Sequence, residues 1–161
     1  MYKGINKYTG KFVNGELIKN IVKEIDPTIV GSIDVNGKIH SLSDNSVIIG
    51  EIENGVKKRY INEYLIGVTE VDPNYLFEYV GLDRNNDRIF TGDLVRYNDK
   101  IYLICYIKDK LVAVSKSGYN FIDFKIFDCD FMNNSCIIGN YLKNNKLMLG
   151  IRILENFYFF R

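Results

Sequence analysis

An acidic turn in the second half of the chain has the spacing that opens a calcium loop. Asp83, Asn85 and Asp87 would occupy the first, third and fifth positions of such a loop. The sixth position holds Arg88 in place of glycine, and the twelfth holds Leu94 in place of a bidentate glutamate. We therefore interpret this run as a polar turn and expect no metal site in it.

Two further features could take part in catalysis. Asp128 and Asp130 would point to the same side of an extended strand, as acid–base or metal chemistry requires, but no third ligand is identifiable, so we interpret them as solvent-facing carboxylates. His40, the single histidine, has no nucleophile motif near it and is interpreted as an exposed strand residue. Catalytic residues and cofactors are accordingly not expected, and the sequence favours a binding protein over an enzyme.

A basic segment is the clearest binding signal. Lys57, Lys58, Arg59 and Tyr60 follow an Asn-Gly pair and would place three cations beside an aromatic ring on a hairpin. Such a group could contact phosphate and stack on a base. The alternative is a solvated hairpin, because neighbouring strand residues point to opposite faces and two glutamates just before the segment offset its charge.

Cysteine usage and charge restrict the class of protein. Cys105, Cys129 and Cys136 are an odd number without paired ligand spacing, which favours a reducing cytoplasm over a secreted disulfide scaffold. We expect Cys105 in the core, while the other two could be neighbours. Lys and Arg number 21 against 20 Asp and Glu, so no global attraction to nucleic acid or membrane is expected. No signal peptide and no run of roughly 20 apolar residues is recognised, which predicts a cytoplasmic protein without a membrane partner.

Short β-strands are the elements that would position these residues. Asn14-Gly15, Asn36-Gly37 and Asn54-Gly55 each lie between apolar or alternating residues, and Asn-Gly favours the positive φ angles of a two-residue hairpin turn. The first third of the chain therefore predicts three antiparallel hairpins. Only residues 61–67 and 133–145 could hold a helical turn or two.

A meander of four strands is predicted in the second half. Residues 93–97, 100–107, 111–116 and 121–127 are apolar runs separated by short polar turns, a pattern typical of a small curled sheet or barrel. Both faces of residues 100–107 are largely apolar, so this strand should be central.

The last segment, residues 147–161, is too apolar for a solvated tail and is expected to pack. Glu155-Asn156 is a plausible turn of a final hairpin. This hairpin would either cap the barrel or cover a sheet edge within the chain, or add to a second copy and form a homo-oligomer.

The stretch EYVGLDRNNDRIFTGDLVRY, residues 78–97, joins the two halves and carries a family resemblance. It resembles the signature of the YopX family of phage and prophage proteins, in which Tyr-Thr-Gly-Leu, a charged turn, an aromatic residue and Glu-Gly-Asp-Ile-Val follow at this spacing. Residues 8–18 and 137–147 resemble the family's N-terminal hairpin and closing segment. The matching residues of the central stretch are Tyr79, Gly81, Leu82, Asp83, Phe90, Gly92, Asp93 and Val95.

These residue types predict a structural corner. Gly81 and Gly92 would permit tight or positive-φ backbone, and Leu82 and Phe90 would anchor the connection in the core. Asp93 could accept backbone N–H bonds where the next strand begins.

The chain also departs from the family pattern. Asp87 stands where the family usually has glycine, so Asn86 or Asp87 should take a left-handed conformation. Thr91 replaces the usual Glu, and Val80 and Asn145 replace Thr and Pro.

Pattern and resemblance together give one expectation. We expect an all-β protein with N-terminal β-hairpins, residues 1–78, packed on a C-terminal small SH3-like barrel with a closing hairpin, residues 79–161, unless both form one compact YopX-like domain. The resemblance implies a phage or prophage accessory protein without an assigned activity. We expect a non-catalytic protein-binding module whose partner is a host or phage protein. The alternative is a nucleotide- or nucleic-acid-binding protein acting against a host or defence pathway.

Overall fold

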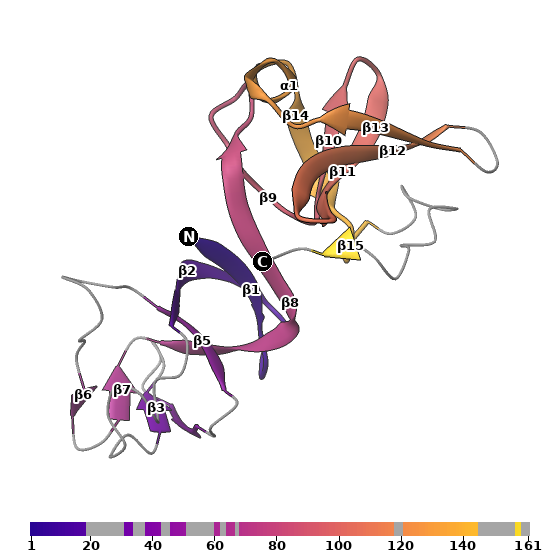
Figure 1. Cartoon of the computed structure of the whole chain (residues 1–161). Coiled ribbons are helices and arrows are strands. Elements are labelled where there is room, and N and C mark those ends of the chain that lie inside the picture. The colour runs from indigo at the N-terminus through magenta and orange to yellow at the C-terminus, as the bar shows by residue number, and fades with distance from the viewer. Residues whose placement is uncertain are drawn as a thin grey trace. The chain divides into compact units, whose positions relative to one another are not determined.

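The computed structural model describes residues 1–18, 31–33, 38–42, 46–50, 60–61, 64–66, 68–117, 121–144 and 157–158. Within these residues the chain consists almost entirely of β-strands with one short helix, which confirms the predicted all-β class (Figure 1). The chain divides into two compact units, Met1–Leu76 and Phe77–Arg161.

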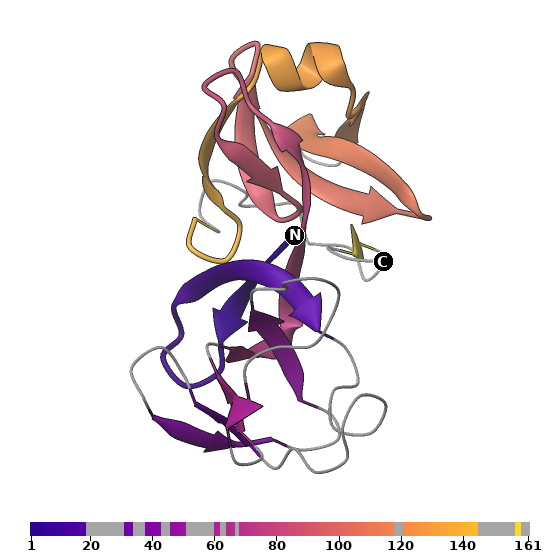
Figure 2. The same ribbon diagram turned by 90° about the vertical axis from the view of Figure 1, so that its left-hand side faces the viewer.

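The first unit contains an antiparallel sheet that closes on itself. Its order is β1 (Tyr2–Asn6), β2 (Phe12–Ile18), β5 (Val47–Gly50) and the beginning of β8 (Thr69–Leu82), and β1 also pairs with β8. Figure 2 shows the strong curvature of the N-terminal strands. The closed sheet surrounds buried Val71 and Leu76, against which partly buried side chains of β1, β2 and β5 pack.

The predicted hairpin turn at Asn14-Gly15 is wrong, because both residues lie inside β2, opposite Lys3 and Tyr2. The apolar pattern explains the difference. With the turn placed earlier, Val13 reaches the core cluster of the first unit.

The chain instead reverses over residues 6–11. The side-chain oxygen of Asn6 accepts the backbone N–H groups of Tyr8 at 2.9 Å and Thr9 at 2.8 Å. Gly10 has a left-handed φ of 66° and donates its N–H to the Asn6 carbonyl at 2.9 Å. An Asn side chain that satisfies two turn donors, followed by a left-handed glycine, is a complete turn of its own.

A second, small sheet of the first unit has the order β4 (Ile39–Ser41), β3 (Gly31–Ile33), β7 (Tyr64–Ile66) and β6 (Tyr60–Ile61). β3 and β4 pair antiparallel on either side of the predicted Asn36-Gly37 turn, which itself lies outside the described residues, as does Asn54-Gly55. The helical turn predicted within residues 61–67 is wrong. Those of its residues that are described form strands, and β7 pairs with β3 on one side and β6 on the other.

The second unit contains the predicted meander. β10 (Asp93–Tyr97), β11 (Lys100–Ile107), β12 (Lys110–Ser117) and β13 (Phe121–Ile126) follow one another, and β14 (Cys136–Asn140) pairs with β10. The sheet curls into a half-barrel. The central position predicted for residues 100–107 is confirmed, because β11 lies between β10 and β12.

Both faces of the β11 sheet carry apolar clusters, as the two-sided pattern predicts. On one face Tyr102 and Ile104 pack with Phe131 of α1 (Cys129–Asn133). On the other face Leu103 and Cys105 form a cluster whose remaining buried members are Leu94 and Val114. Cys105 is therefore a core residue, as predicted.

The helix lies before the segment for which it was predicted. It ends at Asn133, and β14 follows. Within residues 133–145 the possible helical turn is found after β14, where the Asn140 carbonyl accepts the N–H groups of Lys143 at 3.1 Å and Asn144 at 2.8 Å. Packing explains the helix, because Phe131 is buried and stacks on Tyr97 with ring centroids 4.8 Å apart. The local sequence gives no helical period over five residues.

Of the apolar C-terminal segment, residues 147–161, the structure describes two residues. β15 (Phe157–Tyr158) pairs antiparallel with β11, with Tyr158 opposite Tyr106 and Phe157 opposite Ile107. These two residues therefore pair with a strand of their own chain. The predicted turn at Glu155-Asn156 lies outside the described residues.

Candidate functional site

Of the predicted basic binding segment, the structure describes one residue. Lys57, Lys58 and Arg59 lie outside the described residues, and Tyr60 is described as the first residue of β6, opposite Leu65 of β7. Their role as a phosphate-binding hairpin stays a prediction.

Asp83 organises the corner through hydrogen bonds to backbone N–H groups. One carboxylate oxygen accepts the backbone N–H groups of Asn85 at 2.8 Å and Asp87 at 3.0 Å, and the other accepts that of Ile137 in β14 at 3.0 Å. Between them Asn86 has a φ of 64°, the left-handed residue expected at Asn86 or Asp87. The buried carboxylate thus ties its own turn to a strand 54 residues away.

Gly92 occupies a position that a side chain cannot fill. Its φ is 79°, and a Cβ atom there would lie 2.7 Å from the ring of Phe77. The Gly92 N–H donates to the carbonyl of Ile104 at 2.6 Å, and its carbonyl accepts the Tyr141 N–H at 3.0 Å. Thr91 is fully buried and its hydroxyl oxygen accepts the Glu78 N–H at 2.9 Å.

The anchoring role predicted for Leu82 is wrong, whereas Phe90 is buried. β8 and β9 (Arg88–Phe90) pair with an irregularity between Tyr79 and Gly81, which places Leu82 opposite exposed Arg88. Leu82 is 41 % exposed as a result.

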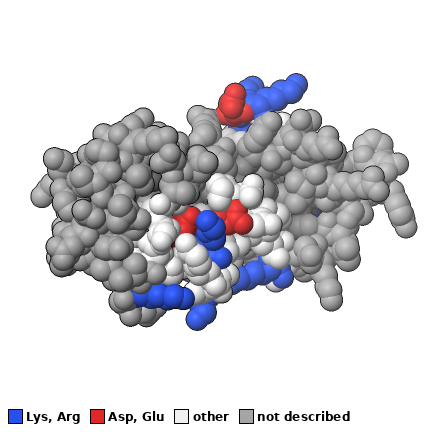
Figure 3. Space-filling view, turned by 90° about the horizontal axis from the view of Figure 1, so that it is seen from below, with Lys and Arg blue, Asp and Glu red and all other residues white. Residues whose placement is uncertain are grey.

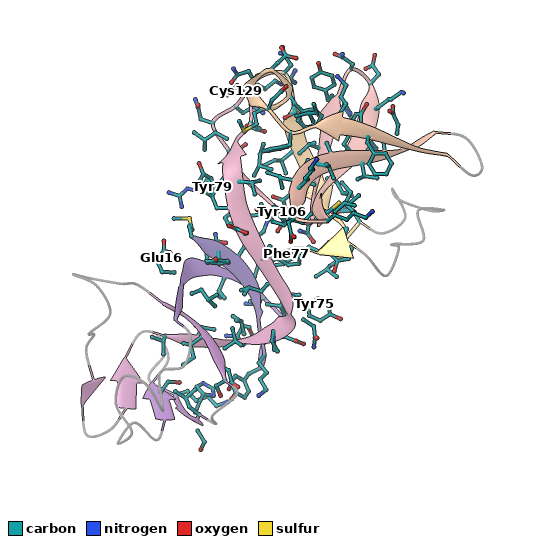
Figure 4. All side chains as sticks on the ribbon, in the orientation of Figure 1. Glu16, Tyr75, Phe77, Tyr79, Tyr106 and Cys129 are labelled. Atoms are coloured by element: carbon teal, nitrogen blue, oxygen red, sulfur yellow. The ribbon has the colours of Figure 1, made fainter. Side chains whose placement is uncertain are left out.

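Two other corner residues, Tyr79 and Gly81, lie in different surroundings. Tyr79, labelled in Figure 4, is also exposed and meets Phe90 edge to face. A Cβ atom at Gly81 would lie 2.2 Å from the Met132 sulfur, so the glycine makes room for that side chain.

Asp128 and Asp130 do not form the carboxylate pair that an extended strand would give. Asp128 is the N-cap of α1 and accepts the Phe131 N–H at 2.9 Å, whereas Asp130 accepts the hydroxyl of Tyr97 at 3.2 Å. The two side chains therefore make different contacts and do not act as a pair, and both residues are exposed, as the interpretation as solvent-facing carboxylates predicts. Among the described residues, no group of three or more His, Cys, Asp or Glu side chains is placed to hold a metal ion.

The cysteines are free thiols in three environments. Cys105 is buried, Cys136 is half-buried and Cys129, labelled in Figure 4, is exposed at the start of α1. Burial raises the pKa of the Cys105 thiol to about 12, so it stays protonated and unreactive at neutral pH.

The first unit contains a polar cluster that the sequence analysis missed. The buried carboxylate of Glu70, 5 % exposed, accepts hydrogen bonds from Lys7 Nζ at 2.7 Å, from the hydroxyl of Tyr8 and from Ser46 Oγ at 3.0 Å. The donors come from the turn after β1 and the start of β5, and Glu70 comes from β8. The Lys7 N–H also donates to the Glu70 carbonyl at 3.1 Å.

The pKa values of this cluster follow from the contacts. Burial alone would raise the pKa of the Glu70 carboxyl, but the hydrogen bonds from its three side-chain donors and the charge of Lys7 outweigh it, so the pKa lies below its ordinary value. The hydrogen bond to Glu70, burial and the negative charge of Glu70 raise the pKa of Tyr8 to about 12. Tyr8 is therefore a hydrogen-bond donor at neutral pH, not a phenolate.

Tyr8 also contacts the single histidine. Its ring stacks on His40 of β4 with centroids 4.3 Å apart and an interplanar angle of 25°. His40 is a strand residue as predicted, but it is half-buried against Tyr8 and not exposed. Because Tyr8 lies 62 residues from Glu70, no sequence pattern signalled this arrangement.

The second unit carries the most exposed large apolar side chains of the described residues. Phe124 is 54 % exposed and Ile126 is 78 % exposed, both on β13. β13 is the last strand of its sheet and, among the described strands, pairs only with β12. Phe124 lies opposite Val114, so the apolar face of the sheet continues to its edge.

The opposite face of β13 carries charged side chains that contact other residues of the unit. Lys125 lies over the Tyr97 ring at 4.2 Å, and Asp123 forms an ion pair with Lys100 at 3.0 Å. The strand therefore presents its apolar side chains and its backbone edge, while its charged side chains contact the rest of the unit.

Charges elsewhere are mixed. On the face in Figure 3, the described acidic side chains lie beside basic ones, and further basic side chains lie among uncharged residues. In the part of the chain that the structure describes, no helix is long and apolar enough to cross a membrane.

Comparison with known proteins identifies no relative. No family model, no curated protein and no solved structure matches this chain.

Proposed function

We propose that the protein is a non-catalytic protein-binding module and that its second unit binds an extended segment of a partner protein along β13. The observation that carries the proposal is the coincidence, on one edge strand, of a backbone edge with no described neighbour and two strongly exposed apolar side chains. An added strand is the occupant that satisfies both, since it pairs with the edge and places alternate side chains over Phe124 and Ile126.

Burial of apolar surface and backbone hydrogen bonding would both favour the added strand. Complete burial of a side chain such as Phe or Ile contributes roughly 1.5 to 3 kcal/mol, and Ile126 has most of its surface still to bury. Each backbone hydrogen bond adds about 1 kcal/mol net. Natural edge strands are commonly protected by outward-pointing charges, but the charged side chains of β13 are bound to Tyr97 and Lys100.

We further propose that the half-barrel is of the SH3-like type and that the chain is a YopX-like accessory protein of a phage or prophage, acting in the host cytoplasm. The consecutive pairing of β10 to β13, with β14 beside β10, supports the first statement. The signature at residues 79–95 and the odd number of cysteines support the others.

Affinity purification of the full chain from bacterial cells tests this function. Wild type is compared with Phe124→Ser/Ile126→Ser, and Leu82→Ser is the matched control because Leu82 is an exposed apolar residue away from β13. We expect a stoichiometric protein partner that resists nuclease treatment, is lost with the β13 variant and is retained with the control.

Two outcomes contradict the proposal. Recovery of nucleic acid or nucleotide without any protein would exclude a protein-binding module. Equal recovery of the partner by the β13 variant, with circular dichroism equal to wild type, would exclude β13 as the binding edge.

A further inference from the structure

Tyr8 is an exposed aromatic side chain that is fixed in place. Its hydroxyl donates to buried Glu70, its ring stacks on His40, and its backbone N–H donates to the Asn6 side chain at 2.9 Å. Exposed side chains usually keep rotamer freedom that binding must remove. Here the contacts within the chain have removed most of it already.

The orientation of the ring follows from its exposure. Tyr8 is 48 % exposed, although His40 covers one ring face and Glu70 engages the hydroxyl. The exposed surface must therefore belong largely to the other ring face and its edge. A second planar group can stack on that face and continue the His40–Tyr8 stack.

Two lysines belong to the same turn as Tyr8, residues 6–11. Lys7 is next to Tyr8 in the chain, and its side chain is 53 % exposed while its ammonium donates to Glu70. An ammonium has three N–H donors, so further donors remain for a ligand. Lys11 closes the same turn through the Asn6 N–H bond to its carbonyl and has an exposed side chain. An aromatic platform beside ammonium groups matches a base that carries a phosphate.

We propose that Tyr8, Lys7 and Lys11 form a binding site for a nucleotide unit, in which the base stacks on Tyr8 and the lysines contact its phosphate. The site lies in the first unit and does not depend on partner binding at β13. It also differs from the predicted basic segment: β6, which follows that segment, and β4, which carries His40, are opposite edges of the small sheet, about 14 Å apart in the sheet direction.

Binding assays with two probes test the site and show whether its ligand is a nucleic acid or a free nucleotide. A fluorescent single-stranded oligothymidylate of about ten nucleotides reports nucleic acid, and thymidine monophosphate in competition reports a free nucleotide. Binding of either probe to the full chain is expected. Tyr8→Ala should weaken it about tenfold or more, and Lys11→Ser should weaken it and reduce its dependence on salt.

Matched variants separate the site from general effects. Tyr75→Ala changes an exposed tyrosine of the same unit, labelled in Figure 4, and should leave affinity unchanged. The proposal is overturned if wild type binds neither probe, or if Tyr8→Ala binds as wild type does. It is also overturned if binding is lost on replacing Lys57, Lys58 and Arg59 by Ser but not on replacing Tyr8.

Photocrosslinking keeps the test independent of mutant folding. Wild-type protein is irradiated with an oligonucleotide containing bromodeoxyuridine, and the modified peptide is identified by mass spectrometry. A crosslink on Tyr8 or His40 is the expected result. Crosslinks confined to other segments overturn the proposal.

Discussion

The side-chain amide of Asn140 donates a hydrogen bond of 3.1 Å to Oδ1 of Asp93, 47 residues away. Both residues are buried, and Oδ2 of Asp93 accepts the N–H of Phe90 at 2.9 Å. The pair joins the end of β14 to the start of β10, where the two strands meet in register. The corner of the second unit is therefore held by polar contacts inside the core.

This pair predicts a coupling energy. Asp93→Ala and Asn140→Ala should each lower the free energy of unfolding by about 1 to 3 kcal/mol, because each leaves a buried polar group without its partner. The double variant should lose less than the sum of the two. Urea unfolding of the four proteins measures the coupling, and strictly additive losses would show that the hydrogen bond contributes nothing.

A second prediction concerns Gly92. Gly92→Ala should destabilise by more than about 1 kcal/mol, since it adds a contact of 2.7 Å with Phe77 to the cost of a left-handed backbone. Gly10→Ala is the matched control, because Gly10 has a φ of 66° but no atom within 4 Å of the added Cβ. The midpoint of thermal unfolding should be well below that of Gly10→Ala in the Gly92→Ala variant. Equal midpoints would mean that the Phe77 ring moves away at no cost.

The Glu70 cluster predicts a pH dependence. The folded-state pKa of Glu70 lies below its ordinary value of 4.5. The folded state therefore binds fewer protons than the unfolded state over this pH range, and the ionised carboxylate stabilises the protein. That stability is complete above pH 4.5 and is lost as the pH falls through the lower folded-state pKa. The stability difference between wild type and Glu70→Gln should therefore shrink on acidification.

Glu16→Gln serves as the control for this titration. Glu16, labelled in Figure 4, has a side chain that is 44 % exposed and forms an ion pair with the Met1 ammonium at 3.1 Å. Its replacement should change stability little at any pH. A Glu70→Gln variant that is as stable as wild type at neutral pH would refute the stabilising role of the charge.

Thiol reactivity provides a fourth prediction. In Cys129→Ser/Cys136→Ser the remaining Cys105 should not react with a disulfide reagent until the protein unfolds, because the thiol is buried and its pKa is raised to about 12. In Cys105→Ser/Cys136→Ser the exposed Cys129 should react at once. Rapid labelling of native Cys105 would show that the sheet opens around it.

Several features follow from local sequence alone. The meander of residues 93–126 was predictable because strands and tight turns are encoded by neighbouring residues: two-residue turns at Asn98-Asp99 and Lys108-Asp109, and apolar residues on both faces of β11 between them. The burial of Cys105 follows from the same two-sided pattern of β11. The left-handed residue at Asn86 was expected from the resemblance to the YopX signature and not from local sequence alone.

Tertiary structure decided the rest. Asn14-Gly15 has the local signature of a turn, yet it lies in a strand because the core of the first unit selects another register. Burial of Phe131 makes a helix of residues that would otherwise be extended and separates Asp128 from Asp130. Tyr8 and Glu70 meet only because β1 closes against β8. Such contacts depend on which distant strands pair, and pairing is settled by the burial of whole faces, which no local run of residues encodes.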